Sequence, residues 1–243
     1  MKVVALIPAR FGATRFPAKL LADLCGKPLI LRTYLSTIAT GVFDEVIVVT
    51  DHIDISNLIQ SEGGKVFFSQ KEHESGSDRI AEAVMNMQAD VVVNVQGDEP
   101  FQDRSSLKNL VGVFLDKEVE VASMMSKFED LDQVPNPNAV KVVVDRKNFA
   151  MYFSRSPIPF FRNTAYKVPV FRHIGGYAYR KNALMAFTQM EKSPMEKVEM
   201  LEQLRLLENG IKIKMVESTH QAVSIDTKED LDRAVVSYKK YFV

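Results

Sequence analysis

Short apolar runs alternate with amphipathic segments in the first hundred residues. The apolar runs lie at residues 2–7, 45–50, 65–68 and 90–95, and all except 65–68 are rich in valine or isoleucine. Such continuous runs are typical of strands buried on both faces of a parallel sheet. Apolar positions recur with helical spacing at 28–39 and 53–62, and a third helix is predicted from a Ser77 cap to about residue 87. This alternation predicts a doubly wound α/β sheet.

From residue 119 onward the pattern changes. Strands are predicted at 121–126, 139–144, 150–154 and 170–180, separated by proline-containing loops. Helices are then predicted at 181–190 and 197–208, followed by a strand at 211–217 and a final helix at 227–239. Thr227 and Asp230 form nearly a capping box at the start of that helix. The prediction is a single α/β domain, residues 1–243, whose segment 140–180 forms a smaller antiparallel subdomain.

Composition narrows the functional classes. The chain has 243 residues, with 31 basic and 31 acidic side chains, and this balance argues against a general binder of nucleic acids or anionic membranes. Hydrophobic residues make up 46% and charged residues 26%, which is ordinary for a globular protein. A single cysteine, Cys25, closes no internal disulfide and indicates a reducing compartment. No apolar run approaches the roughly 20 residues of a membrane span, so we expect a cytoplasmic protein with no membrane insertion.

A cationic loop follows the first predicted strand. Residues 9–27 are predicted to be a loop, and Arg10, Arg15 and Lys19 recur there among small residues. Open α/β sheets bind ligands at the carboxyl ends of their strands, and three cations beside accessible backbone amides suit a polyphosphate. The loop matches neither the dinucleotide fingerprint nor the P-loop, and a solvated surface loop is the alternative.

Three further segments carry candidate functional groups at strand or helix ends. The segment 73–79 (His-Glu-Ser-Gly-Ser-Asp-Arg) offers hydroxyls and amides to a base or sugar, but the local pattern favours helix capping by Ser77. Asp98, in Gln-Gly-Asp-Glu-Pro after the most strand-like run, is a candidate ligand for Mg²⁺. Asp226 is a second candidate if the fold brings it close to Asp98, and otherwise it is an acid beside the Thr227 cap.

At these motifs the chain resembles the 3-deoxy-D-manno-octulosonate (Kdo) cytidylyltransferases, also called CMP-Kdo synthetases. The resemblance covers essentially the whole chain, in order. The family's phosphate loop, its H-x-S-G-T-D-R motif and its Q-G-D-E-P motif resemble residues 7–20, 73–79 and 96–100. Three blocks resemble the sugar side of the family's site, namely Tyr152–Pro159, His173–Arg180 and Leu201–Gly210.

The resemblance implies a Rossmann-like, mainly parallel sheet of the nucleotide-diphospho-sugar transferase type. It implies Mg²⁺-dependent transfer of CMP from CTP to Kdo, with release of pyrophosphate and formation of CMP-Kdo for bacterial lipopolysaccharide biosynthesis. The CTP-binding residues that it implies are Ala9, Arg10, Arg15, Lys19, Ser75, Gly76, Asp78 and Arg79. The sugar-binding residues are Gln96, Arg155, His173, Tyr177, Glu202 and Gln203. The metal ligands are Asp98 and Asp226, which with Arg10 and Lys19 form the catalytic set.

Several of these residues also fit purely structural roles. His173 at a strand start suits a packed histidine, and Arg155 beside two serines suits a loop anchor. Glu202 and Gln203 suit the solvated face of an amphipathic helix. For Arg155, a bidentate guanidinium pair with the Kdo carboxylate is the functional interpretation.

The chain departs from the family pattern at four positions. Ala13 stands where serine is common, Ser77 replaces threonine, Gly176 replaces an apolar residue, and Ser224 replaces a small or apolar residue. None of these changes removes a predicted metal ligand, so they bear on the choice of acceptor. An amino-substituted Kdo or a sialic acid is therefore an alternative acceptor.

Two other functional classes and an oligomeric state complete the hypotheses. A metal-dependent glycosyltransferase is disfavoured because Asp98 is followed by Glu99 and Pro100 instead of a second spaced aspartate. A nucleotide sensor without catalytic activity is the third class. Aromatic and apolar residues in the segment 140–180 exceed what a small flap would expose, and together with the family's homodimers they predict a dimer interface there.

Overall fold

The structure is a computed structural model that describes residues 1–12, 16–73, 75–166, 168–220 and 224–242. It divides into two compact units. The first unit contains residues 1–107 and 222–243, and the second contains residues 108–221. The single-domain organisation stays a prediction.

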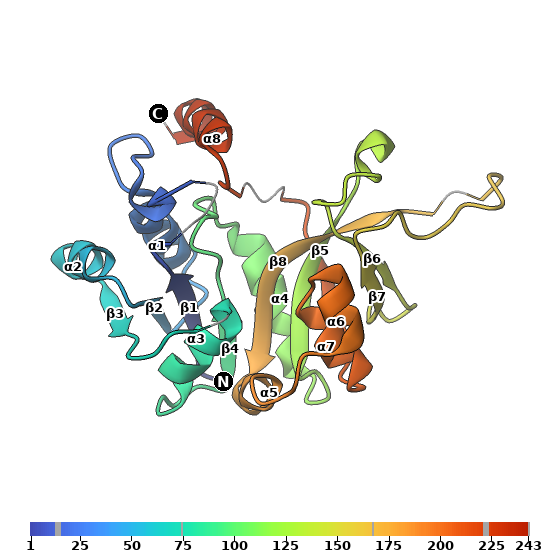
Figure 1. The fold of residues 1–243 in the computed structure, drawn as a ribbon, viewed down its shortest axis with the longest axis horizontal. Coiled ribbons are helices and arrows are strands. Elements are labelled where there is room, and N and C mark those ends of the chain that lie inside the picture. Colours follow the sequence, from blue (N-terminus) through green and yellow to red (C-terminus); the bar gives the residue numbers. More distant parts are fainter. Residues whose placement is uncertain (13–15, 74, 167, 221–223, 243) are drawn as a thin grey trace. The chain divides into compact units, whose positions relative to one another are not determined.

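Four parallel strands form the sheet of the first unit (Figure 1). They are β1 (Val3–Ala9), β2 (Glu45–Thr50), β3 (Lys65–Phe68) and β4 (Val91–Asn94). Their spatial order is β3-β2-β1-β4. The chain therefore winds outward from β1 to β3 and then returns to the other side of β1, which leaves the carboxyl ends of β1 and β4 adjacent where the order reverses.

Helices connect and flank these strands. They are α1 (Leu29–Ala39), α2 (Ile53–Ser61), α3 (Gly76–Val84) and the C-terminal α8 (Lys228–Phe242). A short 3₁₀ turn, η1 (Lys19–Leu21), lies within the predicted loop after β1. Val48, Ile55 and Ile80 are fully buried between the sheet and the helices, so the apolar periodicity that predicted these elements also builds their common core.

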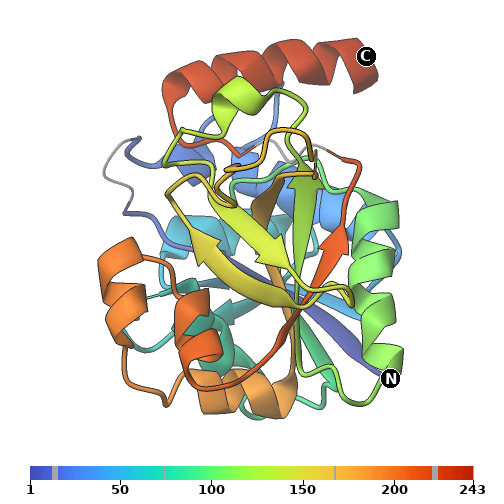
Figure 2. The ribbon, with the colours of Figure 1, turned by 90° about the vertical axis from the view of Figure 1, so that its right-hand side faces the viewer.

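The second unit is built around β5. Strand β5 (Val121–Lys127) pairs antiparallel with β8 (Phe171–Arg180) and parallel with β9 (Ile213–Glu217). Strands β6 (Lys141–Val144) and β7 (Ala150–Ser154) form the antiparallel hairpin drawn in yellow in Figure 2, and β6 also pairs with β8. The predicted antiparallel extension is thus partly seen, because β9 runs parallel to β5.

Three short helices and two 3₁₀ turns lie wholly within the described part of the second unit. The helices are α5 (Lys181–Phe187), α6 (Pro194–Glu199) and α7 (Gln203–Glu208), and the turns are η2 (Val113–Leu115) and η3 (Leu131–Gln133). The single helix predicted at 197–208 is wrong, because Met200 adopts a left-handed φ of 53° and separates α6 from α7. Glu202 and Gln203 consequently stand at the start of a helix instead of on its side.

Two other elements differ from the prediction. The N-cap of α3 is Ser75, not Ser77, because the Ser75 hydroxyl accepts the Asp78 N–H at 3.1 Å. Helix α4 (Arg104–Gly112) was not predicted. At the start of α8, by contrast, the Thr227 hydroxyl accepts the Asp230 N–H at 3.2 Å, and the Asp230 carboxylate accepts the Thr227 N–H at 2.9 Å, which confirms the reciprocal cap.

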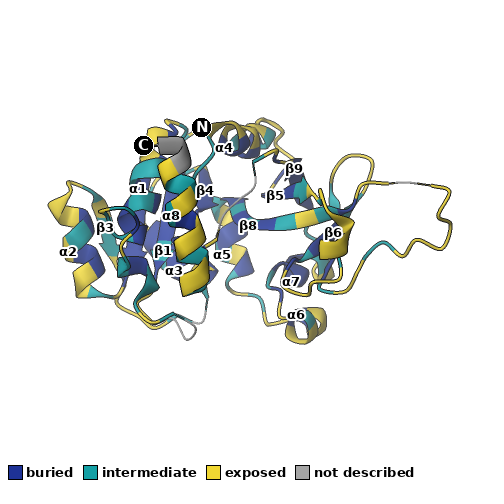
Figure 3. Ribbon diagram, turned by 90° about the horizontal axis from the view of Figure 1, so that it is seen from above, coloured by how far each residue is buried: buried dark blue, intermediate teal, exposed yellow. Residues whose placement is uncertain are grey.

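Burial is greatest in β1, β2 and β4 of the first unit, whereas its edge strand β3 has no buried residue. The central strands of the first unit are dark blue in Figure 3, whereas the segment between β7 and β8 is largely exposed and yellow. Among the residues that the structure describes, no helix is both long and apolar enough to cross a bilayer. The exposed segment lies within the predicted 140–180 subdomain.

Candidate active site

Lys19, Asp98 and Asp226 come together in the first unit. Lys19 Nζ lies 2.5 Å from Asp98 Oδ2 and 3.0 Å from Asp226 Oδ1. Nζ also donates to the backbone oxygen of Ile225 at 3.0 Å. Asp98 follows β4 and Asp226 precedes α8, so two carboxylates from distant parts of the sequence converge on one ammonium group. Local sequence patterns did not establish whether the fold would bring Asp98 and Asp226 together.

Backbone contacts hold the Gln96–Pro100 turn in place. The Thr33 hydroxyl of α1 donates to the Gly97 oxygen at 2.8 Å, and the Ile225 N–H donates to the Asp98 oxygen at 3.0 Å. A Cβ on Gly97 would lie 3.0 Å from the Pro8 oxygen, closer than most side chains are found. Glycine is needed here so that the turn can approach the end of β1, and this approach brings Asp98 to Lys19.

The electrostatics of Lys19 reflect its two carboxylate neighbours. Burial alone would lower the pKa of Lys19, but the charge and hydrogen bond of Asp98, reinforced by Asp226, raise that pKa above its usual value. The ammonium group is therefore held in its charged form beside both carboxylates.

The two carboxylates also suit a divalent cation. Both oxygens approach the same positive group, and Mg²⁺ in proteins is commonly held by one or two carboxylates together with substrate phosphates and water. Among the described residues, no cluster of three or more His, Cys, Asp or Glu side chains forms an all-protein metal site. Asp98 and Asp226 thus fit a magnesium ion whose remaining ligands come from substrate and water.

The start of α3 carries four of the predicted CTP-binding residues. Ser75 and Asp78 bind each other, since the Ser75 hydroxyl donates to Asp78 Oδ2 at 2.9 Å and accepts its N–H. Arg79 Nη2 donates to Asp51 Oδ2 at 2.8 Å, while Arg79 Nη1 is buried without a hydrogen-bond partner in the described part of the chain. A Cβ on Gly76 would lie 3.4 Å from Pro8 Cγ, an ordinary contact, so this turn lies close to the end of β1.

Of the other predicted CTP-binding residues, Ala9 and Arg10 lie at the end of β1, and Lys19 begins η1. Ala9 is buried as its last residue, and the exposed Arg10 follows directly. Arg15 and the departure at Ala13 lie outside the described residues. The structure thus brings Ala9, Arg10 and Lys19 to the carboxyl side of the sheet, as the sequence predicts for a ligand-binding loop.

Asn94 is a candidate that the sequence analysis missed. It is the last residue of β4 and only 4% exposed, and its Oδ1 atom is buried without a partner among the described residues. Its Nδ2 atom would lie 3.9 Å from a Cβ on Gly76, which places the amide beside the start of α3. The sequence signal was an asparagine within a run of valines that is predicted to be buried. Because buried polar groups without a hydrogen bond are rare, such a residue is a candidate for ligand binding.

His173 and Tyr177 lie together on β8 in the second unit. Their ring centroids are 5.3 Å apart, and His173 Nε2 lies 2.9 Å from the Ser123 hydroxyl of β5. The pairing with β5 shifts register between Ser123 and Met124, opposite Gly175 and Gly176, so a bulge separates the two rings along β8. The departure at Gly176 therefore falls in this bulge.

Burial shifts the pKa of both rings. It lowers the pKa of His173 to about 3, assisted by the charge of Arg172, so the imidazole is neutral near pH 7. It raises the pKa of Tyr177 well above its usual value, with Tyr179 and Glu202 reinforcing the shift. The Tyr177 hydroxyl is buried and has no hydrogen bond of regular geometry among the described residues, although the Ser123 side chain is near enough to oppose the rise in its pKa.

Glu202 and Gln203 stand at the start of α7. Gln203 is 5% exposed, and its Nε2 atom is buried without a partner in the described structure. A solvated face for Gln203 is therefore excluded, although its role toward a sugar stays a prediction. Gln96, the other predicted sugar-binding amide, lies in the first unit after β4.

Arg155 follows β7 and is bound mainly by backbone oxygens. Its Nε donates to the Glu199 oxygen at 2.7 Å, Nη1 to the Pro137 oxygen at 2.9 Å, and Nη2 to the Met200 oxygen at 3.4 Å. Through these contacts Arg155 anchors the surrounding loops, which is the structural role that the sequence analysis gave as an alternative. A guanidinium group has five N–H donors, so three such bonds leave two donors for an anion.

The comparisons with known proteins agree with this geometry. A family model described as cytidylyltransferase matches residues 4–213, and the chain belongs to the cytidylyltransferase family. It is 54% identical, over 237 residues, to the 3-deoxy-manno-octulosonate cytidylyltransferase of Flavobacterium johnsoniae, covering 96% of this chain and 97% of the relative. It is 52% identical, over 236 residues, to the enzyme of the same name from Christiangramia forsetii, covering 96% and 95%. The resemblance that the motifs indicated is confirmed.

A solved structure supports the same assignment. It is described as CMP:2-keto-3-deoxy-manno-octonic acid synthetase complexed with CTP, and it superposes with a TM-score of 0.94 at 36% identity, covering 99% of both chains. The α/β fold class with a mostly parallel sheet is confirmed. The chain is thus a nucleotidyltransferase of the cytidylyltransferase class.

Proposed function

We propose that this protein transfers CMP from CTP to Kdo, releasing pyrophosphate and forming CMP-Kdo. The convergence of Asp98 and Asp226 on Lys19 is the observation that carries the proposal. The names of the relatives, which are 3-deoxy-manno-octulosonate cytidylyltransferases, and the CTP in the similar solved structure support it. The product would serve lipopolysaccharide biosynthesis, and we expect the enzyme to act in the cytoplasm.

The reaction needs positioning and charge neutralisation more than covalent catalysis. The anomeric hydroxyl of Kdo attacks the α-phosphorus of CTP, and pyrophosphate leaves on the opposite side. Arg10 and Lys19 would bind the triphosphate, and Lys19 would balance the charge that builds on departing pyrophosphate. Ser75, Asp78 and Arg79, at the start of α3, would hold the cytidine. Asn94, with an unpaired buried oxygen beside that turn, fits a contact to an N–H or O–H donor of the nucleotide.

The metal requirement follows from the carboxylate pair. Asp98 and Asp226 would hold Mg²⁺, which when bound neutralises phosphate oxygens and lowers the pKa of an attacking hydroxyl. On the sugar side, the neutral His173 and the Tyr177 hydroxyl would bind Kdo hydroxyls, together with Gln96, Glu202 and Gln203. Arg155 would pair with the Kdo carboxylate through its two remaining donors.

Pyrophosphate release tests the proposal. The purified protein should release pyrophosphate from CTP only when Kdo and Mg²⁺ are both present. Asp226→Asn should lower kcat about 10²-fold or more with the fold retained. The exposed Asp232, on the same C-terminal helix, offers the matched control Asp232→Asn, which should leave kcat unchanged. No release with active Kdo, CTP and Mg²⁺ would exclude this function.

The same assay separates the alternative acceptors. An amino-substituted Kdo and a sialic acid would be added in competition with Kdo, and kcat/KM would be compared between them. We expect Kdo to be preferred. A higher kcat/KM for another acid would leave the proposed CMP transfer intact but would identify that acid, instead of Kdo, as the preferred acceptor.

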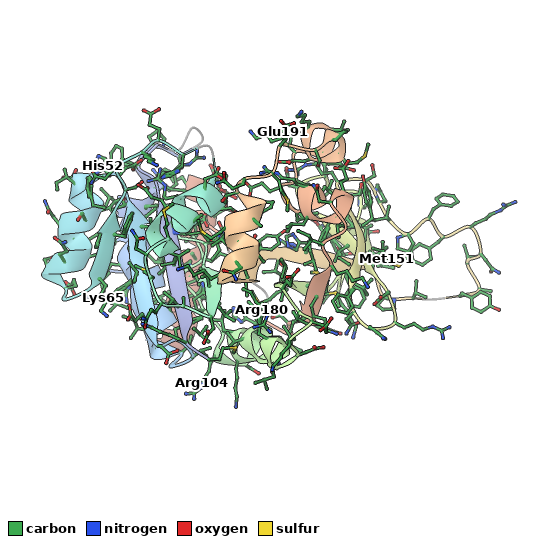
Figure 4. The ribbon with its side chains drawn as sticks, turned by 90° about the horizontal axis from the view of Figure 1, so that it is seen from below. His52, Lys65, Arg104, Met151, Arg180 and Glu191 are labelled. Atoms are coloured by element: carbon green, nitrogen blue, oxygen red, sulfur yellow. The ribbon has the colours of Figure 1, made fainter. Side chains whose placement is uncertain are left out.

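We also propose a homodimer formed through the 140–180 subdomain. Met151 on β7, labelled in Figure 4, is 65% exposed, and Phe160 and Tyr166 in the following segment are 87% and 73% exposed. Apolar surface of this kind suits a protein interface. Sedimentation at micromolar concentration should give a dimer, and Met151→Lys should weaken it, whereas Leu115→Lys, outside this segment, should not. A wild-type monomer would refute the dimer.

A further inference from the structure

Lys141 is a completely buried lysine. It begins β6, its exposed fraction is 0%, and the predicted reaction does not use it. Its Nζ atom donates to the backbone oxygen of Asn136 at 3.0 Å and to the backbone oxygen of Arg155. No carboxylate within the described structure lies at ion-pair distance from it. A buried ammonium with two carbonyl partners is an unusual solution, because lysine is rarely buried without a paired charge.

Two side chains, Lys141 and Glu199, bind the backbone of Arg155, one at its carbonyl and one at its N–H. Lys141 binds the Arg155 carbonyl, and the Glu199 carboxylate accepts the Arg155 N–H at 2.9 Å. The second Glu199 oxygen accepts the Ser154 hydroxyl at 2.6 Å. Lys141 lies opposite Ser154 in the β6–β7 register, so these two side chains share one face of the hairpin, and Glu199 of α6 binds Ser154. Arg155 therefore has its N–H, its carbonyl and its guanidinium fixed at once.

The charges of this group do not cancel. Lys141 and Arg155 are cations and Glu199 is the anion, which leaves one net positive charge at the end of β7. Burial lowers the pKa of Lys141 from its usual value, and the nearby Glu199 opposes that shift. An apolar side chain of similar length would fill the space of Lys141 without the desolvation cost of a charge, but it would leave the carbonyls of Asn136 and Arg155 without this donor. Retaining the ammonium here points to a role beyond packing.

We propose that Lys141 is a positioning residue for the acceptor's carboxylate. It fixes the backbone of Arg155 and adds a buried positive charge, so that the free N–H donors of Arg155 face a sugar-acid carboxylate in one geometry. The inference rests on the proposed transfer to an acid sugar. It assigns Lys141 no contact with CTP, so a substitution of Lys141 should change the KM for the acceptor and not the KM for CTP.

Steady-state kinetics of Lys141→Met and Lys141→Gln test this assignment. In Lys141→Met, loss of a charge-assisted contact should raise the KM for Kdo about ten- to a hundredfold, with the KM for CTP within about twofold of wild type. Lys141→Gln keeps one neutral donor for a carbonyl and should raise the KM for Kdo by a smaller factor. The exposed Lys117 offers the control Lys117→Met, which should change neither constant.

Each outcome decides the inference. A KM for Kdo that stays within twofold of wild type in folded Lys141→Met overturns it. If Lys141→Met unfolds early in a thermal melt, Lys141→Gln decides by the same criterion. An equal rise in the KM for Kdo and the KM for CTP also overturns it, because a general structural role would affect both substrates. Absence of pyrophosphate release by the wild-type protein with any acid sugar is a different result, which removes the proposed function itself.

Discussion

Replacing Arg205 should destabilise the protein far more than replacing an exposed arginine. Arg205 of α7 binds Glu196 of α6 through two bonds, Nε to Oε2 at 2.8 Å and Nη2 to Oε1 at 2.6 Å. Its guanidinium also lies 4.8 Å from the ring centroid of Phe187, and Nη1 donates to the Met190 oxygen at 3.1 Å. The two charged side chains are only 8% and 7% exposed, so water does not replace a lost partner.

The size of the effect follows from this burial. Removing one partner of a buried ion pair leaves an uncompensated charge and costs about 3–5 kcal/mol. At about 2–4 °C per kcal/mol for a chain of this length, Arg205→Met should lower Tm by roughly 6–20 °C. Arg233, whose side chain is 72% exposed in its pair with Asp230, provides the control. Arg233→Met should cost less than about 1 kcal/mol.

A double substitution makes the reasoning refutable. Arg205→Met combined with Glu196→Leu removes both charges, but it also removes the carboxylate that accepts the Ser193 N–H at the start of α6, so it should recover part of the stability lost in the single variant. Urea unfolding would give the free energies of all four proteins, and kcat would be followed in parallel because α7 begins at Gln203. A cost below about 1 kcal/mol for Arg205→Met, or a double variant no more stable than the single one, would contradict the argument.

Three further predictions concern the cap, the turn and the buried histidine. Ser75→Ala should cost about 1 kcal/mol of stability, since Ser75 caps α3 through the Asp78 N–H; an unchanged urea midpoint would count against it. Gly97→Ala should lower Tm and kcat together, because its Cβ would press on the Pro8 oxygen; a fully active, equally stable variant would refute this. The pKa of His173 is lowered to about 3, so the unfolded chain binds a proton that the folded chain rejects. The free energy of unfolding should therefore fall as pH drops from about 6.5 to about 3, by at most about 1.4 kcal/mol per unit from this group. His173→Asn should reduce that slope in acid unfolding, and identical slopes would disprove it.

Local sequence predicted the strands of the first unit well for a physical reason. Strands buried on both faces need continuous apolar side chains, and runs such as 45–50 provide them with little ambiguity. The helix boundaries were harder. Met200 takes a left-handed conformation that its side chain does not favour, so the break between α6 and α7 has no local signal. Helix α4 begins with Arg104-Ser105-Ser106, a polar start that hides its buried Leu107 and Leu110.

The site shows the same division between local and long-range information. Motifs identified Lys19, Asp98 and Asp226 as chemically capable groups, but Lys19 and Asp226 are 207 positions apart and only the fold brings them within 3.0 Å. Arg155 illustrates the converse. Its motif suggested a carboxylate partner, whereas the structure shows that backbone oxygens and Glu199 first fix its position. Contacts to backbone oxygens leave no trace in sequence, because every residue type provides them.

The neutral total charge conceals two local charge clusters of opposite sign. In the first unit, Lys19 faces two carboxylates, which leaves one net negative charge and favours an added cation. In the second unit, Lys141 and Arg155 face Glu199, which leaves one net positive charge and favours an added anion. A metal-assisted transfer to a sugar acid requires both, because one cluster must accept a cation with triphosphate and the other must accept a carboxylate. The single net charges of the two clusters are opposite, so they cancel within the balance of 31 basic and 31 acidic residues.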